Sequence, residues 1–533
     1  MTTDITLRSK PTRCINVVNF IRGVEPRFET DLLLPVQKQM EIILEHKLPA
    51  TWLLQFDALV SGKFVDYLKK NMAKNHEAGF WFEMNEMHCK AAGVEWRGRP
   101  GFEWDHFPPV AFTIGYNAEE RVKLADTAMA KFKEIWGFYP KSIASWNLDS
   151  ITLKHLTDKY KVDAYAVCRD QIATDGFTIW GAPIAGYYPS TTNCWSPALD
   201  VKNQISTPIF RMLGQDPVYY YNNGFILPTG QKVHQPDTME PVWISGRSQV
   251  FIDRFLEMIG KTETQDFAYA QLGQENSFPW RDQEPAYARQ MKALAGMMVA
   301  GSVHVETMGD SGRRFKKRFK TTPTQAQIML EDPFANTKNP EGSIWYQSRF
   351  YRADLHTRGD MIYLRDLTVY SDKNEQPFLR KATRLNDVEQ RMPPVLDGYH
   401  WSKSPGSFDE VGAGGFFFND KLMLRIAGKP KVREEGNVTI VEVPVMGGET
   451  LVVRFEEKRM TARLSGGSKP SLVFQWDATK AAFKGIEGQR VKYQWLGFDY
   501  SIEASGGMVK TGENGWTLTG TKSEISLKLA QPA

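Results

Sequence analysis

The sequence predicts an α/β protein in which a (β/α)7-8 barrel is followed by an antiparallel β-sandwich C-terminal region. Two observations carry this prediction. Residues 13–310 alternate short apolar runs with longer amphipathic segments, a pattern typical of βα units and a parallel sheet. After Thr321, strand-like runs are separated by turns rich in Gly, Asn, Asp and Lys, and helical periodicity is nearly absent, which is typical of antiparallel sheets.

Seven apolar runs within residues 13–310 have the composition of buried parallel strands. Amphipathic segments follow them, and Asn117 before Glu119 and Glu120 predicts the start of one helix. The expected strands are 14–20, 50–56, 79–83, 142–146, 164–168, 267–272 and 302–306, and the expected helices are 33–44, 62–75, 118–136, 150–160, 247–260 and 284–300. Seven units of this kind predict a closed barrel, with an open doubly wound sheet as the structural alternative.

The change of pattern predicts two domains. Residues 1–320 are expected to form a barrel catalytic domain, and residues 321–533 one or two β-rich sandwich domains. An aromatic, proline-rich insertion at 179–242 interrupts the barrel. Its rings are suited either to line a sugar-binding cleft or to pack a long loop onto the barrel.

Composition excludes several classes of protein. Of the 533 residues, 42% are hydrophobic and 24% charged, so disordered, coiled-coil and collagen-like chains are excluded. The 66 Lys and Arg against 62 Asp and Glu leave a net charge of +4, too balanced to predict nucleic acid as a partner. No apolar stretch is long enough for a membrane span.

The N-terminal residues and the cysteines bear on the compartment. The N-terminus does not read as a signal peptide, and the four Cys form no CxxC pair, so buried free thiols are expected. These features favour a cytoplasmic protein, or a periplasmic or secreted one if a signal peptide is missing from this chain. A homodimer is one expected state.

Candidate catalytic groups follow the predicted strands, because the carboxyl ends of barrel strands form the active site of such folds. Glycoside hydrolysis needs two carboxyl groups, and Asp149 and Glu275 are the first expected pair. The other candidates are Asp170, Glu25, Glu83 and Glu306. Asp149 also stands where it could simply cap the helix that begins at Ser150.

Aromatic, amide and guanidinium side chains near the same strand ends are the expected sugar-binding groups. Aromatic rings stack on the apolar faces of sugars, and arginines pair with carboxylates, so an acidic sugar such as a sialic or uronic acid is a candidate substrate. Charge balancing among neighbouring carboxylates is the alternative role for the arginines. The candidates are Asn19, Arg22, Trp81, Trp146, Arg169, Gln274, Tyr188, Asn193 and Arg349.

Three segments resemble the superfamily that contains glycoside hydrolase families 38 and 57 and the polysaccharide deacetylases. They are HEAGFW at 76–81, GFYPKS at 137–142 and SWNLD at 145–149. The resemblance implies a (β/α)7 barrel and, in the glycosidase branch, a carboxylate nucleophile after the fourth strand, on or near Asp149. Deacetylases of the superfamily hold a divalent metal with an Asp from a paired-Asp motif after the first strand and with an HxxxH motif.

This sequence departs from the deacetylase motifs. The first strand leads to Asn19-Phe20-Ile21-Arg22-Gly23 without an acidic pair, and the fourth residue after His76 is Phe80. Neither a metal nor another cofactor is therefore expected. The sequence favours a glycoside hydrolase that acts through carboxyl groups at the barrel mouth. The alternatives are a metal-dependent polysaccharide deacetylase or esterase, and a carbohydrate-binding protein without catalysis.

Overall fold

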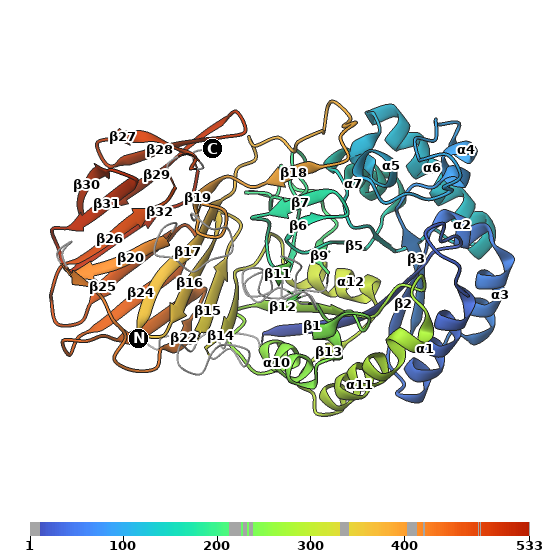
Figure 1. Ribbon diagram of the computed structural model, residues 1–533, viewed down its shortest axis with the longest axis horizontal. Coiled ribbons are helices and arrows are strands. Elements are labelled where there is room, and N and C mark those ends of the chain that lie inside the picture. The colour runs from blue at the N-terminus through green and yellow to red at the C-terminus, as the bar shows by residue number, and fades with distance from the viewer. Residues whose placement is uncertain are drawn as a thin grey trace, which may run out of the picture.

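A computed structural model shows a barrel beside a β-sandwich (Figure 1). The structure describes residues 11–212, 225–226, 232–233, 238–330, 341–401, 413–418, 422–477, 479 and 481–531. The predicted fold class is confirmed, because parallel strands alternate with helices in the N-terminal part and antiparallel sheets form the C-terminal part.

The barrel is built from parallel strands. In spatial order they are β12 (Phe267–Leu272), β1 (Thr12–Ile21), β2 (Ala50–Leu54), β3 (His76–Trp81), β4 (Ser142–Ala144), β5 (Ala164–Val167) and β9 (Ile209–Arg211). Two short strands flank this set: β8 (Gly186–Tyr187) runs antiparallel to β9, and β13 (His304–Val305) pairs with β1. Phe210 of β9 stacks on Tyr269 of β12, with ring centroids 4.6 Å apart, so the two edges meet and the barrel is nearly closed.

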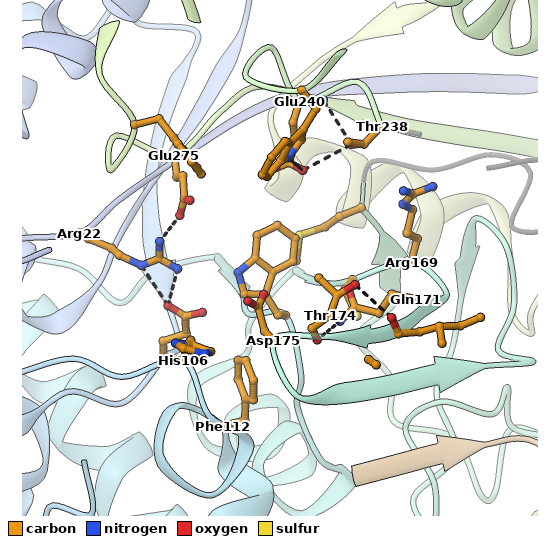
Figure 2. A pocket seen from close by; sticks show the side chains of 18 of the residues that line it. Arg22, His106, Phe112, Arg169, Gln171, Thr174, Asp175, Thr238, Glu240 and Glu275 are labelled. Carbon is orange, nitrogen blue, oxygen red and sulfur yellow. Dashed lines mark hydrogen bonds and ion pairs between the residues drawn. The ribbon is translucent and has the colours of Figure 1, made fainter. Parts of the chain in front are cut away.

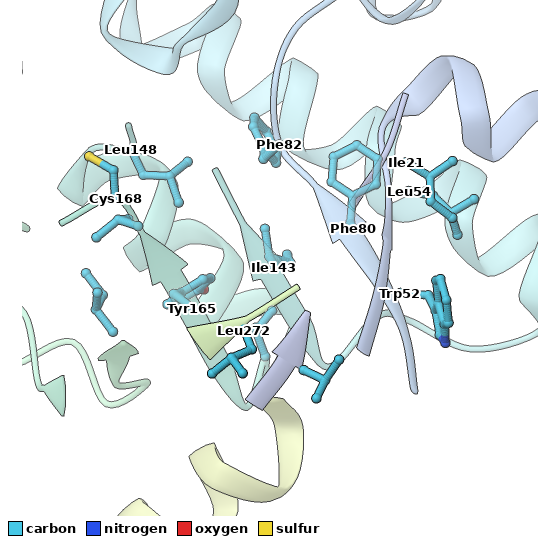
Figure 3. Packing of buried hydrophobic residues seen from close by; sticks show 14 of the residues in the cluster. Ile21, Trp52, Leu54, Phe80, Phe82, Ile143, Leu148, Tyr165, Cys168 and Leu272 are labelled. Atoms are coloured by element: carbon cyan, nitrogen blue, oxygen red, sulfur yellow. The ribbon is translucent and has the colours of Figure 1, made fainter. Parts of the chain in front are cut away.

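Helices cover the outside of this sheet because their apolar faces need a partner surface. They include α1 (Leu33–Glu45), α3 (Gly62–Asn71), α6 (Ala118–Trp136), α7 (Ser150–Tyr160), α10 (Gln249–Gly260) and α11 (Trp280–Val299). Figure 3 shows part of the core between strands and helices, including Trp52, Phe80 and Tyr165. A last helix, α12 (Met308–Arg318), covers the amino ends of the strands, where Phe315 packs on Phe267.

The insertion predicted at 179–242 contains a barrel strand that the sequence did not reveal. Strand β9 has only three residues, which is too short for an apolar run to stand out, yet it pairs with β5 in parallel register. Residues 213–224, 227–231 and 234–237 of the insertion lie outside the described residues. The division at residues 320 and 321 remains a prediction.

Two antiparallel sheets form the sandwich and share one hydrophobic core. The first contains β14 (Gln325–Met329), β15 (Glu341–Gln347), β16 (Tyr351–Arg358), β17 (Met361–Val369), β20 (Ala413–Phe418), β26 (Pro470–Gln475), β31 (Gly515–Gly520) and β30 (Gly507–Gly512), with β19 (Pro394–Asp397) and β21 (Leu422–Met423) beside this path. The second contains β22 (Lys431–Glu435), β23 (Val438–Pro444), β24 (Thr450–Glu456), β25 (Arg459–Leu464), β32 (Glu524–Lys528), β29 (Phe498–Ser505), β28 (Arg490–Trp495) and β27 (Phe483–Glu487).

A small third sheet lies between the two parts of the chain (Figure 1). Its hairpin, β6 (Gln171–Thr174) and β7 (Phe177–Trp180), follows barrel strand β5. Its third strand, β18 (Val388–Arg391), comes from the later part of the chain and pairs with β7 in parallel register. The hairpin is therefore held by backbone hydrogen bonds from beyond the barrel.

A buried ionic network fixes the base of this hairpin. One oxygen of Asp170 accepts from Arg211 of β9 at 2.7 Å and the other from Arg352 of β16 at 2.6 Å. Arg352 also pairs with both oxygens of Asp366, at 3.1 and 2.9 Å. Burial raises the pKa of Asp366 to about 6, although the charge of Arg352 opposes this. Because these groups are almost fully buried, each charge depends on its partner.

We expect Arg352→Met to lower the free energy of unfolding by about 3–5 kcal/mol, because it leaves the carboxylates of Asp170 and Asp366 buried without their shared cation. Urea denaturation followed by tryptophan fluorescence measures this loss. Arg349→Met is the matched control: Arg349 forms a partly exposed pair with Glu457, so its loss is expected to stay within about 1 kcal/mol. Equal losses in the two variants would contradict the role given to the network.

Candidate functional site

A cavity of about 690 Å³ opens at the carboxyl ends of the barrel strands. Figure 2 shows polar and aromatic side chains from several elements around it. The lining residues are Arg22, Arg27, Glu83, Trp104, His106, Phe112, Trp146, Cys168, Arg169, Gln171, Ile172, Ala173, Thr174, Asp175, Met212, Thr238, Glu240, Trp243, Glu275 and Phe278. Its size and its aromatic lining are typical of a small-molecule site, although it also holds several charged groups.

The guanidinium of Arg22 lies between two carboxylates in this cavity (Figure 2). It donates to Glu83, which follows β3, at 3.0 Å, and it also pairs with Glu275, which follows β12. Burial alone would lower the pKa of Arg22, but the charges of Glu275 and Glu83 outweigh it and raise this pKa above its usual range. Arg22 is therefore a permanent cation in the site.

The backbone around Arg22 is also fixed. Its N–H donates to the side-chain oxygen of Asn276 at 2.8 Å, and Asn276 donates back to its carbonyl at 3.0 Å. Gly23 lies so close to Asp57 that a Cβ there would stand 2.8 Å from backbone atoms of Asp57 and Ala58. Asp57 accepts from the N–H of Val24 at 3.0 Å, and burial raises the pKa of its carboxyl to about 6.

Aromatic rings form much of the cavity wall. The Arg22 guanidinium lies 4.1 Å from the centroid of the Trp104 ring, and that of Arg27 lies 4.8 Å from it. Trp146 meets Trp81 edge to face, at a centroid distance of 5.3 Å. The first contacts are cation–π interactions that hold the arginines against the ring, and the partly exposed ring of Trp146 offers apolar surface to a ligand.

The β6–β7 hairpin supplies another wall. Arg169 and residues 171–175 line the cavity, and the turn places Asp175 and Gly176 in the left-handed region, with φ of 51° and 74°. A Cβ on Gly176 would stand 2.1 Å from the carbonyl oxygen of Asn386, which precedes β18. The turn therefore needs glycine both for its conformation and for the close approach of the later segment.

Glu240 has the most unusual protonation of the lining carboxyls. Its pKa is raised to about 7, first by burial and then by the negative charge of Glu275, while Arg169 acts in the opposite direction. The indole N–H of Trp243 donates to its carboxyl at 3.1 Å. A carboxyl that is partly protonated near neutral pH can both give and accept a proton, which suits general acid–base chemistry.

Glu275 lies in the same cavity with a different environment. Burial raises its pKa, but the positive charges of Arg22 and Arg27 oppose this. Glu240 has no ion pair of this kind among the described residues. The two carboxyls therefore differ in their partners: Glu275 is paired with Arg22, whereas Glu240 can exchange its proton near neutral pH.

The structure brings together five of the residues expected from the sequence. Arg22, Glu83, Trp146, Arg169 and Glu275 line the cavity. Asn19, Trp81 and Gln274 are buried next to it: Trp81 stacks on Phe20 at 3.8 Å, and the Asn19 oxygen accepts from the N–H of Gln274 at 3.1 Å. They support the lining residues rather than face the cavity.

The other expected carboxylates have structural partners outside the cavity lining. Asp149 caps α7 through the N–H groups of Ile151 and Thr152 and pairs with Arg121 at 3.1 Å, so the capping interpretation fits it. Asp170 belongs to the network with Arg211 and Arg352.

Glu25 and Glu306 differ in position but are both used in ion pairs. Glu25 pairs with Arg27 at the rim of the cavity. Glu306 pairs with Arg314 at 2.9 Å and contacts Cys14 near the amino end of β1, at the other end of the barrel.

Three expected binding residues also lie elsewhere. The Tyr188 hydroxyl donates to the carbonyl of Phe319, next to α12. Asn193 is fully buried, where its oxygen accepts from the N–H of Trp195. Arg349 pairs with Glu457 in the sandwich. Tyr188 and Asn193 were expected in the site because they lie in the aromatic insertion, and Arg349 because it lies in an aromatic, basic segment. The fold uses all three in structural contacts instead.

Glu240 and Trp243 were missed. They lie at the end and just beyond the predicted insertion, where no strand pattern marks an active-site position. Glu240 is distinguished only by its surroundings, which are built by residues distant in sequence. The available signal was an isolated acidic residue within an aromatic, proline-rich stretch.

The metal site of the resembled deacetylases does not fit these residues. Across the described ranges, no group of three or more His, Cys, Asp or Glu side chains is placed to hold a metal ion. The carboxyl end of β1 carries Asn19 and Arg22, and the guanidinium of Arg22 contacts the two nearest glutamates. The chain itself thus supplies a cation, the guanidinium of Arg22, at the carboxyl end of β1.

The comparisons with known proteins concern the fold. No protein-family model matches the chain, and no curated protein matches it in sequence. A crystal structure described as a glycoside hydrolase/deacetylase from Parabacteroides distasonis aligns with a TM-score of 0.57 and 15% identity, over 77% of this chain and 95% of that one. This likeness shows a shared fold over about three quarters of this chain.

Two further solved structures align with a little over half of this chain. One is a polysaccharide deacetylase from Mycobacterium smegmatis, with a TM-score of 0.35, 11% identity and coverage of 59% of this chain and 93% of that one. The other is the peptidoglycan deacetylase PdaC from Bacillus subtilis, with a TM-score of 0.25, 10% identity and coverage of 57% and 95%.

These comparisons correct the predicted enzyme class. The structure with a TM-score of 0.57 is described as a glycoside hydrolase/deacetylase, and the other two structures are described as deacetylases. The prediction of a glycoside hydrolase was therefore wrong, and nothing supports the resemblance to families 38 and 57. What the chain shares with the structure described as a glycoside hydrolase/deacetylase is its fold. In the part of the chain that is described, no helix combines the length and apolarity needed to cross a bilayer.

The pKa of Glu240 predicts a pH dependence of stability. Because folding raises this pKa from 4.5 to about 7, the folded chain binds the proton more tightly than the unfolded chain. The resulting stabilisation is complete below the unfolded pKa and is lost as the pH rises through about 7. The free energy of unfolding is measured for the wild type and for Glu240→Gln from about pH 5 to about pH 8. As the pH increases, the wild type should lose stability relative to the variant. A constant difference between the two curves would contradict this.

Proposed function

We propose that the chain is a hydrolase that removes an acyl group from a carbohydrate, with Glu240 as the group that transfers protons. The observation that supports this most is the pKa of about 7 for Glu240, in a cavity walled by aromatic rings. The fold shared with the structure described as a glycoside hydrolase/deacetylase is consistent with acyl removal.

The proposed reaction needs one proton acceptor that later becomes a donor. Ionised Glu240 takes a proton from water while the water oxygen bonds to the acyl carbonyl carbon. The tetrahedral oxyanion then collapses, the bond from the acyl carbon to the sugar oxygen or nitrogen breaks, and Glu240 returns the proton to that leaving atom. In this reaction Arg169, which lines the cavity opposite Arg22 in Figure 2, stabilises negative charge on the carbonyl oxygen.

The lining supports a sugar ligand but not an acidic one in particular. Tryptophan faces suit sugar rings, and the amide of Gln171 and the hydroxyls of Thr174 and Thr238 can bond to ligand hydroxyls. The lining carboxyls are Glu83, Asp175, Glu240 and Glu275, and the lining guanidiniums are Arg22, Arg27 and Arg169. Since four carboxyls face three arginines in the lining, the cavity has no excess positive charge that would favour a sialic or uronic acid.

Sugar binding without turnover is the second candidate function. The ion pairs of Arg22 favour this function. Glu83 and Glu275 share Arg22 as their counterion, which reduces the number of carboxyls available for chemistry. This function predicts tryptophan fluorescence changes on adding sugar, through Trp104 and Trp146, with no product formed.

Acetate release from N-acetylated chito-oligosaccharides and from acetylated xylan tests the proposal. Glu240→Gln should lower the rate by a factor of about 10² to 10⁴, because the proton acceptor is lost. The matched control is Glu284→Gln, an exposed glutamate on α11 outside the cavity, which should keep the wild-type rate. Wild-type activity in Glu240→Gln would overturn the assignment of Glu240.

The pH profile gives a separate test of Glu240. The wild-type rate should rise with pH through a limb near 7, because the base must be ionised. Trp243→Phe removes an N–H donor to Glu240 that favours its ionised form, so the limb should move to higher pH. Sugar binding without acetate release on either substrate would favour the second candidate function.

A further inference from the structure

We propose that the guanidinium of Arg22 is the resident cation of this cavity, in place of a divalent metal ion, so that the site binds and uses no such ion. This inference rests on the cavity being the functional site. Its main measurements are of metal binding, so they do not depend on turnover.

The first argument is that the acidic groups best placed to bind a metal are already engaged. Glu83 follows β3 and Glu275 follows β12, and Arg22, which follows β1 between them, pairs with both. The three side chains are 1–8% exposed, so solvent screens their charges little. A divalent ion would have to share these carboxylates with a positive charge in direct contact with them.

The second argument is that Arg22 cannot easily move aside. Its guanidinium packs against the Trp104 ring at 4.1 Å, and one of its nitrogens also lies 3.2 Å from the hydroxyl of Ser277. Its backbone is bonded on both sides to Asn276. The cation is therefore fixed by packing and hydrogen bonds that do not depend on the two glutamates.

The third argument concerns nitrogen donors. His106 is the histidine among the lining residues, and its Nδ1 lies 3.6 Å from Asp105. His88, seven residues after the end of β3, is fully buried against Phe56, and its Nε2 contacts the carbonyl of Leu124 at 2.9 Å. Neither joins Glu83 and Glu275 in a ligand set, whereas zinc and similar ions favour imidazole ligands.

Metal binding by the full-length protein tests this proposal. We expect purified wild type to contain far less than one equivalent of Zn²⁺, Co²⁺, Ni²⁺ or Mn²⁺ by mass spectrometry. Titration with Co²⁺ or Zn²⁺ should give no saturable heat, and EDTA should leave the melting temperature unchanged. One tightly bound equivalent that Glu83→Gln abolishes would overturn the proposal.

Variants at Arg22 test whether the guanidinium is what excludes the ion. Arg22→Met should show the saturable Co²⁺ binding that the wild type lacks, because two carboxylates lose their cation, and Glu83→Gln in the same chain should remove this gain. Arg27→Met is the matched control, since Arg27 lines the cavity but pairs with Glu25, and it should gain nothing. No gain in folded Arg22→Met would overturn the proposal, and the wild-type measurements decide it even if that variant does not fold.

Activity separates this inference from the proposed function. Acetate release that persists in EDTA supports both, and acetate release that requires added metal overturns this inference while keeping the function. If no acetate is released and no metal binds, the proposed function fails and the inference stands.

Discussion

The contact between the barrel and the sandwich depends on the carboxylate of Asp170. It lies between the guanidiniums of Arg211 in the barrel and Arg352 in the sandwich, and both arginines also donate to backbone carbonyls of residues 168–183. Because every partner is buried, the network holds only in one arrangement of barrel, hairpin and sandwich. That arrangement places Arg169, the neighbour of Asp170, in the wall of the cavity.

The cavity is organised by how its charges are distributed. Arg22 neutralises Glu83 and Glu275 at the carboxyl ends of β1, β3 and β12, and Glu240 approaches from the insertion without an arginine of its own among the described residues. The carboxyls therefore differ in their surroundings, since Glu83 and Glu275 are paired with Arg22 and Glu240 is partly protonated near neutral pH. One set of acidic residues thus supplies both fixed charge and a proton-exchanging group.

The fold could be predicted from sequence wherever an element has a pattern of its own. Segments of five or more residues rich in apolar side chains predicted β1, β2 and β12, and Asn117 before Glu119 and Glu120 predicted the start of α6. The three-residue β9 has no such pattern, because only its pairing with β5 in the folded chain identifies it as a strand. The site residues could be predicted only in part, for the same reason. Strand ends pointed to Arg22, Glu83 and Glu275, but the pKa of Glu240 and the partners of Asp170 arise from residues 35 to 182 positions away.

The parallel pairing of β18 with β7 has a consequence for how such a protein can change over time. The hairpin that walls the cavity takes its third strand from a segment that follows the first strands of the sandwich. A recombination event that joined this barrel to a different C-terminal region would delete that strand and expose an edge of the hairpin. The two regions are therefore expected to be inherited and diversified as one unit, rather than exchanged as interchangeable modules.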